Sequence, residues 1–284
     1  MLTVRHIAGA TARWARRCRL QYLFALAAGL LCLTVAARAE ESSGVEWRRI
    51  EPGFDFAKYE LGSASYIIRP EVFLLRFDLS RFALDLAVPA GFDPKGAAVA
   101  EDIRSLVRRA GGVAGINANF FDENNRPLGL VAARSEVLQP LHRGGRVLTG
   151  VFALRDGVPV IEQRDNFSMN GVSLAVQAGP RLVEHGNVTR LLDADDVSRR
   201  SGIAVTRHHA VILYATVLRF PGASLREVQH MLIDPTLEVT DALNFDGGGS
   251  SQLFLEQVEG FSGETLISGG DSIPVGVVVK RRGG

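Results

Sequence analysis

The chain has 284 residues, of which 46% are apolar, 22% charged and 7% aromatic. This composition belongs to a globular protein with a sizeable core, and it excludes disordered, collagen-like and coiled-coil chains. Residues 1–39 hold six Arg and no acid, so the rest of the chain carries 26 Lys and Arg against 31 Asp and Glu. Such an acidic body is a poor non-specific binder of nucleic acid, and no nucleic-acid partner is expected.

The first 39 residues have the pattern of a secretory signal peptide. A basic stretch ends at Arg19, a nearly continuous apolar run covers residues 20–35, and Ala37 and Ala39 are small residues where a signal peptidase reads. We therefore predict cleavage after Ala39 and a periplasmic or secreted protein. The apolar run approaches the length that spans a bilayer, so an uncleaved anchor stays open, and it is the only membrane contact expected.

The body that follows contains no cysteine, because Cys18 and Cys32 both precede it. It therefore has no disulfide, no thiolate metal site and no cysteine nucleophile. No tandem repeat or low-complexity linker interrupts it. We predict a single domain over residues 45–282.

Apolar residues that alternate with polar ones predict several strands. Residues 73–79 and 82–88 have this period and are separated by a short break, so we expect them to be antiparallel neighbours. Residues 147–154 and 158–161 flank an Asp-Gly turn and predict a second hairpin. Further apolar runs predict strands over residues 211–218 and 274–280.

Two helices are expected in addition to the strands. The first, over residues 99–110, has acids near its start, arginines near its end and Gly111-Gly112 after it, as the dipole and capping rules favour. Ser224 and Glu227 form a capping box for the second, over residues 225–232. We predict an α+β fold with mixed, mainly antiparallel sheets and a few packed helices.

An apolar strand after the second helix ends in chemistry-bearing residues. Asn244 and Asp246 place an amide and a carboxylate at the strand end, and Ser250 adds a hydroxyl. Between these residues stand three glycines whose backbone N–H groups are uncovered, namely Gly247, Gly248 and Gly249. Such a backbone can form a cradle for anion oxygens, so an acid beside it suits cleavage next to a phosphate. The alternative is an ordinary Asp-Gly turn.

The strand after the first helix ends in a second polar group. Asn117 and Asn119 lie on the same side of a strand, as amides that bind sugar hydroxyls would. Asp122 is a candidate partner carboxylate for Asp246 in general acid–base catalysis, or else it caps a turn. Carboxylate and amide oxygens also bind hard cations, so a divalent cation is allowed as a cofactor, although the spacing does not demand one.

Two arginines are candidate phosphate ligands. Arg200 could grip a phosphate through two parallel hydrogen bonds. Arg199 beside it leaves open a merely basic surface segment. Arg181, which follows Gly179-Pro180, is a second candidate, and we include Gly179 in the predicted binding set.

Six stretches resemble one protein family in order and spacing: GINANFF (115–121), GLV (129–131), AVQAGPRLVEHG (175–186), RRSGIAV (199–205), DALNFDGGGSSQLF (241–254) and IPVGVVV (273–279). Over residues 111–282 the chain is similar to the phosphodiester glycosidase family. The resemblance implies hydrolysis of the bond between a sugar's anomeric carbon and a phosphate esterified to a second group. It also implies that Asp246 and its glycines lie in the catalytic pocket, with Asn117 and Arg200 lining it.

The main expectation is an exported hydrolase that acts on a sugar-1-phosphate diester in envelope or extracellular glycans. Asp246 would activate water or stabilise an oxocarbenium-like centre, while the amides of residues 247–250 and Arg200 stabilise the leaving phosphate. One departure motivates an alternative, because the family often has an Arg where residues 269–274 have none. The alternative is a non-catalytic periplasmic protein that binds or assembles polysaccharide on the same fold.

Overall fold

The computed structural model describes residues 45–62, 69–93, 99–217, 222–256 and 265–283. The predicted signal peptide lies outside these residues. Residues 45–284 form one compact unit. Within the described part of the chain, no helix is both long and apolar enough to cross a membrane.

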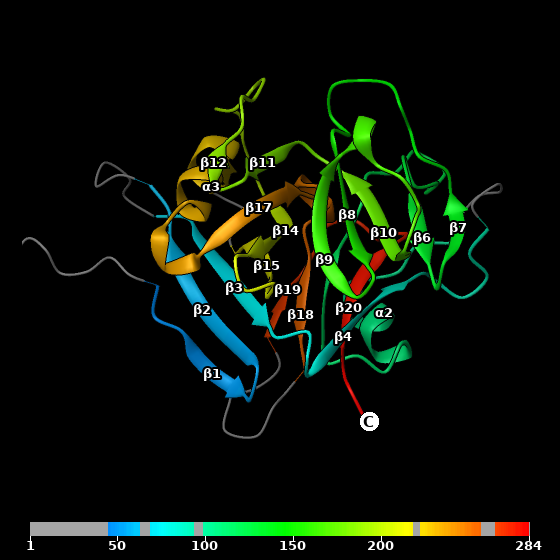
Figure 1. The fold of residues 1–284 in the computed structure, drawn as a ribbon, viewed down its shortest axis with the longest axis horizontal. Coiled ribbons are helices and arrows are strands. Elements are labelled where there is room, and N and C mark those ends of the chain that lie inside the picture. Colours follow the sequence, from blue (N-terminus) through cyan, green and yellow to red (C-terminus); the bar gives the residue numbers. More distant parts are fainter. Residues whose placement is uncertain (1–44, 63–68, 94–98, 218–221, 257–264, 284) are drawn as a thin grey trace, which may run out of the picture. The chain divides into compact units, whose positions relative to one another are not determined.

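Three antiparallel sheets make up most of the described chain (Figure 1). The largest has eight strands in the spatial order β1 (Arg48–Glu51), β2 (Phe54–Glu60), β3 (Glu71–Phe77), β15 (Val211–Thr216), β14 (Ser201–Thr206), β17 (Val239–Asn244), β11 (Arg181–Glu184) and β12 (Asn187–Val188). A five-stranded sheet has the order β7 (Glu136–Gln139), β6 (Val131–Ala133), β10 (Val172–Ala178), β8 (Gly150–Arg155) and β9 (Val158–Gln163). The third has the order β19 (Thr265–Ile267), β18 (Leu253–Leu255), β5 (Ala114–Asn117), β20 (Gly276–Arg281) and β4 (Phe82–Ala87).

Smaller elements complete the fold. Strands β13 (Val197–Ser198) and β16 (Ala223–Ser224) pair with each other, and the described α-helices are α2 (Ile103–Arg109) and α3 (Leu225–Leu232). Three single 3₁₀ turns also occur: η1 (Arg164–Asn166), η2 (Pro235–Leu237) and η3 (Gly248–Ser250). The antiparallel sheets are confirmed, and with two α-helices among the described residues the fold is mainly β.

The expected pairing of residues 73–79 with residues 82–88 is wrong. Strand β3 pairs with β2 and β15, whereas β4 pairs with β20 in a different sheet. The turn between them carries the chain from one sheet to the other, and the rings of Phe77 and Phe82 meet across the core with centroids 5.9 Å apart. Alternation predicts which face of a strand is buried but does not choose its partner.

The second predicted hairpin is confirmed. Strands β8 and β9 pair along their whole length, from Gly150 opposite Gln163 to Arg155 opposite Val158. Asp156 and Gly157 at the turn both have positive φ, 49° and 81°. Two such residues in succession form the tight turn whose twist suits a two-residue hairpin, which is why Asp-Gly is a strong local signal.

Both predicted helices form where their caps place them. Asp102 caps α2 by accepting from the Ser105 N–H at 3.0 Å, so the helix begins at Ile103 rather than at residue 99. Helix α3 has the predicted bounds and the complete capping box between Ser224 and Glu227. Capping is a local interaction within four residues, so it needs no tertiary information.

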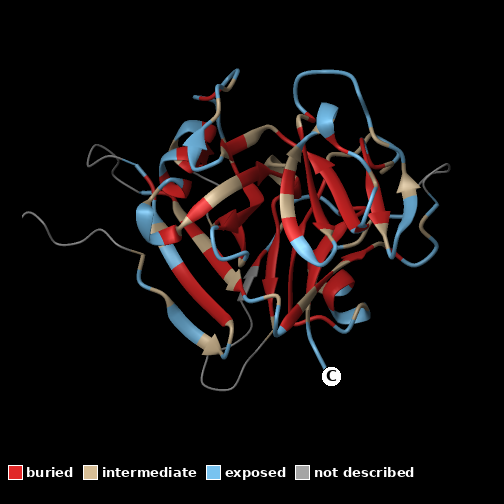
Figure 2. Cartoon of the chain, in the orientation of Figure 1, coloured by how far each residue is buried: buried red, intermediate tan, exposed pale blue. Residues whose placement is uncertain are grey.

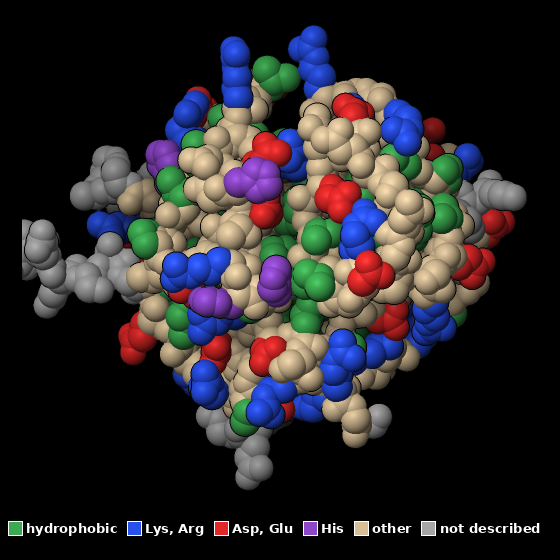
Figure 3. Space-filling model, viewed as in Figure 1, with side chains coloured by type: hydrophobic (Ala, Val, Ile, Leu, Met, Phe, Trp, Pro, Cys, Tyr) green, Lys and Arg blue, Asp and Glu red, His purple; other side chains and the backbone are tan. Residues whose placement is uncertain are grey.

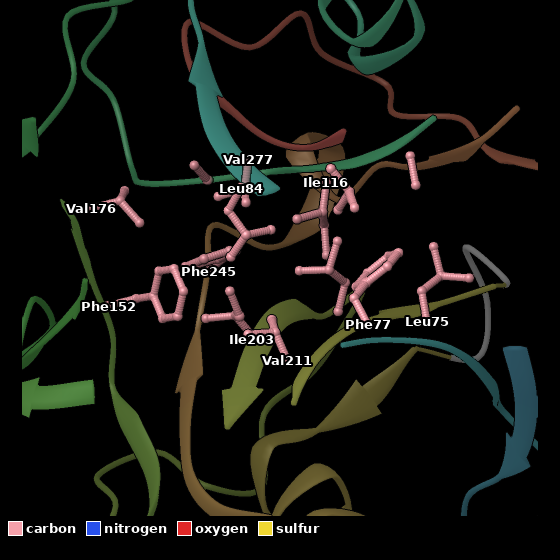
Figure 4. Packing of buried hydrophobic residues seen from close by; sticks show 14 of the residues in the cluster. Leu75, Phe77, Leu84, Ile116, Phe152, Val176, Ile203, Val211, Phe245 and Val277 are labelled. Carbon is pink, nitrogen blue, oxygen red and sulfur yellow. The ribbon is translucent and has the colours of Figure 1, made fainter. Parts of the chain in front are cut away.

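One buried cluster joins all three sheets (Figure 4). Figure 4 shows side chains from each sheet pointing toward one another around Phe245, and they include Phe77, Leu84, Ile116, Phe152, Val176, Ile203, Val211 and Val277. The strands that supply them are buried along most of their length, while turns and outer elements are exposed (Figure 2). Phe245 lies one residue before Asp246, so core packing fixes the position of that acid.

The capping box of α3 should contribute measurably to stability. We expect Ser224→Ala to lower the free energy of unfolding by about 1 kcal/mol, because the Glu227 N–H loses its side-chain acceptor. Urea denaturation monitored by circular dichroism measures the change. The matched control is Ser168→Ala at an exposed position, which should stay within about 0.5 kcal/mol of the parent. Equal effects of the two substitutions would contradict the capping role.

Candidate functional site

The two polar strand ends meet in the structure through a single amide. The Asn117 side chain at the end of β5 donates from Nδ2 to the Asp246 carbonyl oxygen at 2.7 Å. Its Oδ1 accepts from the Gln252 N–H at 3.0 Å. Asn117 is 1% exposed and uses both ends of its amide inside the protein. It therefore positions Asp246 and does not offer the open amide that we expected for substrate.

Further hydrogen bonds hold the backbone of Asp246. Its carbonyl also accepts from Ser201 Oγ at 2.8 Å, and its N–H donates to the Ala118 carbonyl at 3.0 Å. The neighbouring Phe245 N–H donates to the Ser201 carbonyl at 2.8 Å. The carboxylate thus stands on a backbone held from two sheets, which is the rigid support a catalytic group requires.

The surroundings of the Asp246 side chain raise its pKa toward neutral pH. Burial, with a smaller contribution from the negative charge of Asp271, raises the pKa of Asp246 to about 6. Hydrogen bonds from the Ser250 hydroxyl and the Gly247 N–H oppose this shift because they stabilise the charged form. A carboxyl group with a pKa near the working pH is suited to general acid–base catalysis.

Each of the three positions after Asp246 requires glycine for a different steric reason. Gly248 has φ +57°, in the left-handed region that favours glycine. A Cβ on Gly247 would lie 2.8 Å from the Arg199 carbonyl oxygen, and one on Gly249 would lie 2.1 Å from Asp271 Oδ2. The run therefore lets two other segments approach the turn that carries Asp246.

The glycine run is a bonded turn and not the open anion cradle that we expected. The Gly247 N–H bonds to the Asp246 carboxylate, and the Gly248 N–H donates to the Arg199 carbonyl at 3.0 Å. The Ser250 N–H donates to the Gly247 carbonyl at 3.1 Å. Because these donors are already bonded, the run holds the acid in place, and most of the charge that would bind a phosphate must come from elsewhere.

Asp271 is the functional candidate that sequence reasoning missed. Its carboxylate lies against Gly249, its N–H donates to the Gly249 carbonyl at 3.2 Å, and its own carbonyl accepts from Gln252 Nε2 at 2.8 Å. It is the acid whose charge acts on Asp246. The Gly269-Gly270-Asp271 sequence, a second glycine pair beside an acid, was the available signal.

Asp122, the expected partner of Asp246, has a local role instead. Its carboxylate accepts from the N–H groups of Asn124 and Arg126, both at 2.9 Å, and its N–H donates to the Arg126 carbonyl. Arg126 also forms a long ion pair with it at 3.9 Å. These bonds stabilise a turn, which is the alternative that the sequence left open for this residue.

Arg200 lies beside the glycine turn with part of its guanidinium committed to the protein. Its Nε donates to the Ala223 carbonyl at 3.0 Å and its Nη2 to the Asp196 carbonyl at 2.5 Å. Its Nη1 lies 3.9 Å from the position that a Cβ on Gly247 would occupy. Burial lowers the pKa of Arg200, but a guanidinium stays charged in proteins, so this nitrogen carries a cation to the turn.

Arg199 is a buried structural residue and not part of a basic surface. It is 5% exposed, and its guanidinium donates to the carbonyls of Ser251 at 2.6 Å and Ser268 at 2.8 Å. These bonds hold the chain before Asp271 against the chain after the glycine run. The side chains of Arg199 and Arg200 therefore point to opposite sides of the backbone, as those of neighbouring residues in an extended chain do. For this reason the two arginines have different roles.

Two buried amides near Asp246 have unsatisfied polar atoms. Asn119 is 3% exposed, and neither its Oδ1 nor its Nδ2 has a hydrogen-bond partner among the described residues. Asn244 donates to the Gly179 carbonyl at 3.1 Å, but its Oδ1 has no such partner. Buried polar atoms without partners are costly, so each is a candidate contact for a bound ligand or water.

A cavity of about 600 Å³ lies beside this cluster. Arg200, Asn244 and Gly179 line it, together with Arg181, whose guanidinium forms a 2.6 Å ion pair with Glu184. Asp246 is not among the lining residues, so the acid stands next to the cavity and not inside it. The volume is within the range of about 300–1,000 Å³ that small-molecule pockets occupy.

Metal ligands do not gather in the part of the chain that the structure describes. No three His, Cys, Asp or Glu side chains lie together there in a way that could hold an ion.

Comparison with known proteins identifies similar folds and one matching family. No curated protein matches the chain in sequence at a significant level. Among solved structures, the catalytic domain of zebrafish N-acetylglucosamine-1-phosphodiester alpha-N-acetylglucosaminidase, auto-inhibited by its pro-peptide, superposes with a TM-score of 0.61 at 14% identity, covering 84% of this chain and 89% of that one. A hypothetical protein from Synechocystis superposes with a TM-score of 0.57 at 17% identity, covering 85% of this chain and 64% of that one.

These likenesses show a shared fold, and the sequence gives the family. The profile of the family described as phosphodiester glycosidase matches residues 110–280, which include β5, the Asp246 turn and Asp271. The match covers more than half of the chain. The chain belongs to the phosphodiester glycosidase family.

Proposed function

We propose that the protein is an exported hydrolase that cleaves the bond between a sugar's anomeric carbon and the phosphate of a sugar-1-phosphate diester. Family membership supports the reaction class. The amino-terminal pattern of residues 1–39 supports export to the periplasm or the cell exterior. Envelope or extracellular glycan phosphodiesters are the expected substrates.

The observation that carries the proposal is the half-buried, doubly anchored Asp246 with its raised pKa. Burying a carboxylate costs free energy, and the protein reinforces this cost by placing Asp271 close by. A group held at such a cost is typical of a functional site. Asn117 and Ser201 fix its backbone, so its side chain can face a substrate with little reorganisation.

The chemistry needs an acid–base group and a stabilised leaving group. A phosphate monoester is a stable anion, so its departure from the anomeric carbon requires charge stabilisation more than protonation. The Arg200 guanidinium supplies that positive charge. The Asp246 carboxylate takes a proton from water as the water oxygen bonds to the anomeric carbon, and the carbon–oxygen bond to phosphate breaks. The products are the free sugar and the phosphate monoester.

Replacing Asp246 or Arg200 should abolish turnover without unfolding the protein. We expect Asp246→Asn and Arg200→Lys each to lower kcat by about 100-fold or more, since one removes the base and the other removes the guanidinium that the Ala223 and Asp196 carbonyls hold beside the glycine turn. The assay measures reducing sugar released from a glycan phosphodiester, with circular dichroism as the fold check. The control is Asp195→Asn, an exposed acid paired with Arg226 on the surface.

Isotopic water distinguishes the bond that breaks. Oxygen-18 from water should appear in the sugar and not in the phosphate. Full turnover by Asp246→Asn would refute the proposed mechanism. Glycan binding by the wild-type protein with no product after long incubation would favour the alternative, a polysaccharide-binding or assembly protein, which the absence of an Arg in residues 269–274 motivates.

Asp271, the acid next to Asp246, should shift the pH at which activity rises. If Asp246 acts as a base, kcat/KM rises as the pH passes through about 6. Asp271→Asn removes a negative charge that favours the protonated form, so the rise should move to lower pH. A pH–rate profile of both proteins tests this. Movement caused by Asp122→Asn and not by Asp271→Asn would restore the pairing expected from sequence.

The raised pKa also makes a prediction about stability that is independent of substrate. The native state holds its proton on Asp246 up to about pH 6, whereas the unfolded chain loses it near 3.8. The free energy of unfolding therefore falls as the pH rises between these values, by an amount on the order of 3 kcal/mol. Asp246→Asn, which stays neutral, should be more stable than the parent at pH 7 and nearly equal at pH 3.5. Urea denaturation across this range measures the difference, and a difference that does not vary with pH would contradict the shift.

A further inference from the structure

The cavity beside Asp246 differs in charge from the rest of the body. Four arginines and two aspartates line it, although residues 40–284 carry more acids than bases. We propose that this cavity is a subsite for a second negatively charged group of the glycan, on the far side of the scissile phosphate. The proposal rests on the proposed function for the identity of the substrate as a glycan, and it adds that the substrate is acidic beyond its phosphodiester.

Two of the lining arginines can use their positive charge to bind a ligand. Arg146 and Arg190 are exposed, and neither forms an ion pair with any other residue that the structure describes. Arg146 lies in the loop before β8, and Arg190 follows β12, so they reach the cavity from different sheets. Figure 3 shows basic side chains on both sides of a notch at the top of the view, above these two sheets in Figure 1.

The loop that carries Arg146 is held by two polar side chains beneath it. Gln177, which is fully buried, accepts from the His142 N–H at 2.8 Å and donates to the carbonyls of His142 at 2.7 Å and Leu148 at 3.1 Å. Arg164 donates to the carbonyls of Gly144 at 2.5 Å and Leu148 at 3.3 Å. The loop backbone is thus fixed on both sides of Arg146, which lowers the entropy that binding would cost.

The segment that carries Arg190 is fixed in the same manner from helix α3. Gln229 is 5% exposed and donates from Nε2 to the carbonyls of Leu182 and Thr189, both at 2.8 Å. The Thr189 hydroxyl in turn donates to the Arg181 carbonyl at 2.5 Å. Two buried glutamines from unrelated parts of the chain therefore hold the backbone beside the two available cations.

The acids in the cavity do not neutralise this charge. Arg181 is compensated by Glu184, and Arg200 is bound to the Asp196 carbonyl oxygen, not to its carboxylate. Four arginines and two aspartates line the cavity, and Glu184 outside the lining compensates Arg181, so one positive charge remains in excess. Phe120, Leu191 and Leu192 add apolar surface to the lining. A charged sugar unit offers both features, since its ring has apolar faces and its carboxylate or phosphate pairs with arginine.

Binding to the inactive variant tests the subsite without turnover. Asp246→Asn protein is titrated by calorimetry with a trigalacturonate, with a trisaccharide that carries one phosphate, and with a neutral trisaccharide of the same length. We expect at least one acidic probe to bind about tenfold more tightly than the neutral probe, and the better one identifies the anion. Arg146→Glu and Arg190→Glu should each weaken binding of the acidic probe about tenfold and leave the neutral probe unchanged.

A matched control separates local from general charge effects. Arg143→Glu makes the same change of net charge at an exposed position in the same loop, outside the cavity lining, and should alter affinity less than twofold. Equal binding of acidic and neutral probes, or an equal loss with Arg143→Glu, would overturn the subsite. Failure of the wild-type protein to release sugar, with acidic selectivity intact, would refute only the proposed hydrolysis. Turnover without acidic selectivity would refute only the subsite.

Discussion

The amide of Asn117 connects the parts of this protein on which its chemistry depends. It bonds simultaneously to the carbonyl of Asp246 and to the N–H of Gln252, and so joins the end of β5 to both sides of the glycine turn. Because Asn117 is buried, loss of this side chain would leave the Gln252 N–H without its acceptor and the Asp246 carbonyl with only its bond from Ser201. The position of the acid therefore depends on a contact between residues 129 positions apart.

Around this contact, some residues hold the backbone in place, and others carry the charged groups that we propose to react. Arg199 and Gln252 hold the chain near Asp271, and the glycines admit that chain to within contact of the turn. The result is a half-buried carboxylate with a second acid nearby, a combination that opposes ionisation and costs stability. Arg200 and the cavity beside it supply positive charge on the adjacent side, and the proposed reaction uses the acid and the cations on neighbouring parts of one substrate.

Local signals in the sequence were reliable wherever the interaction itself is local. The capping box of α3, the Asp102 cap of α2 and the Asp-Gly turn between β8 and β9 each involve residues within four positions of one another. Pairing of strands was not predictable in the same way. The pattern of residues 73–79 and 82–88 is that of a hairpin, yet the two strands belong to different sheets. This arrangement brings Phe77 and Phe82 together in the core, where both rings are removed from water.

From residue types and spacing, the chain alone determined that it folds as a β-rich domain and that Asn117 and Asp246 stand at ends of strands. Those features follow from periodicity and from short motifs. Only the tertiary structure decided which acid accompanies Asp246, that the N–H groups of Gly247 and Gly248 are already bonded, that Arg199 is buried, and that arginines from two sheets share a cavity. Each of these features depends on packing between segments that are distant in the sequence. Burial and the proximity of other groups then set the charge, protonation and accessibility of a side chain, and no single stretch of sequence contains that information.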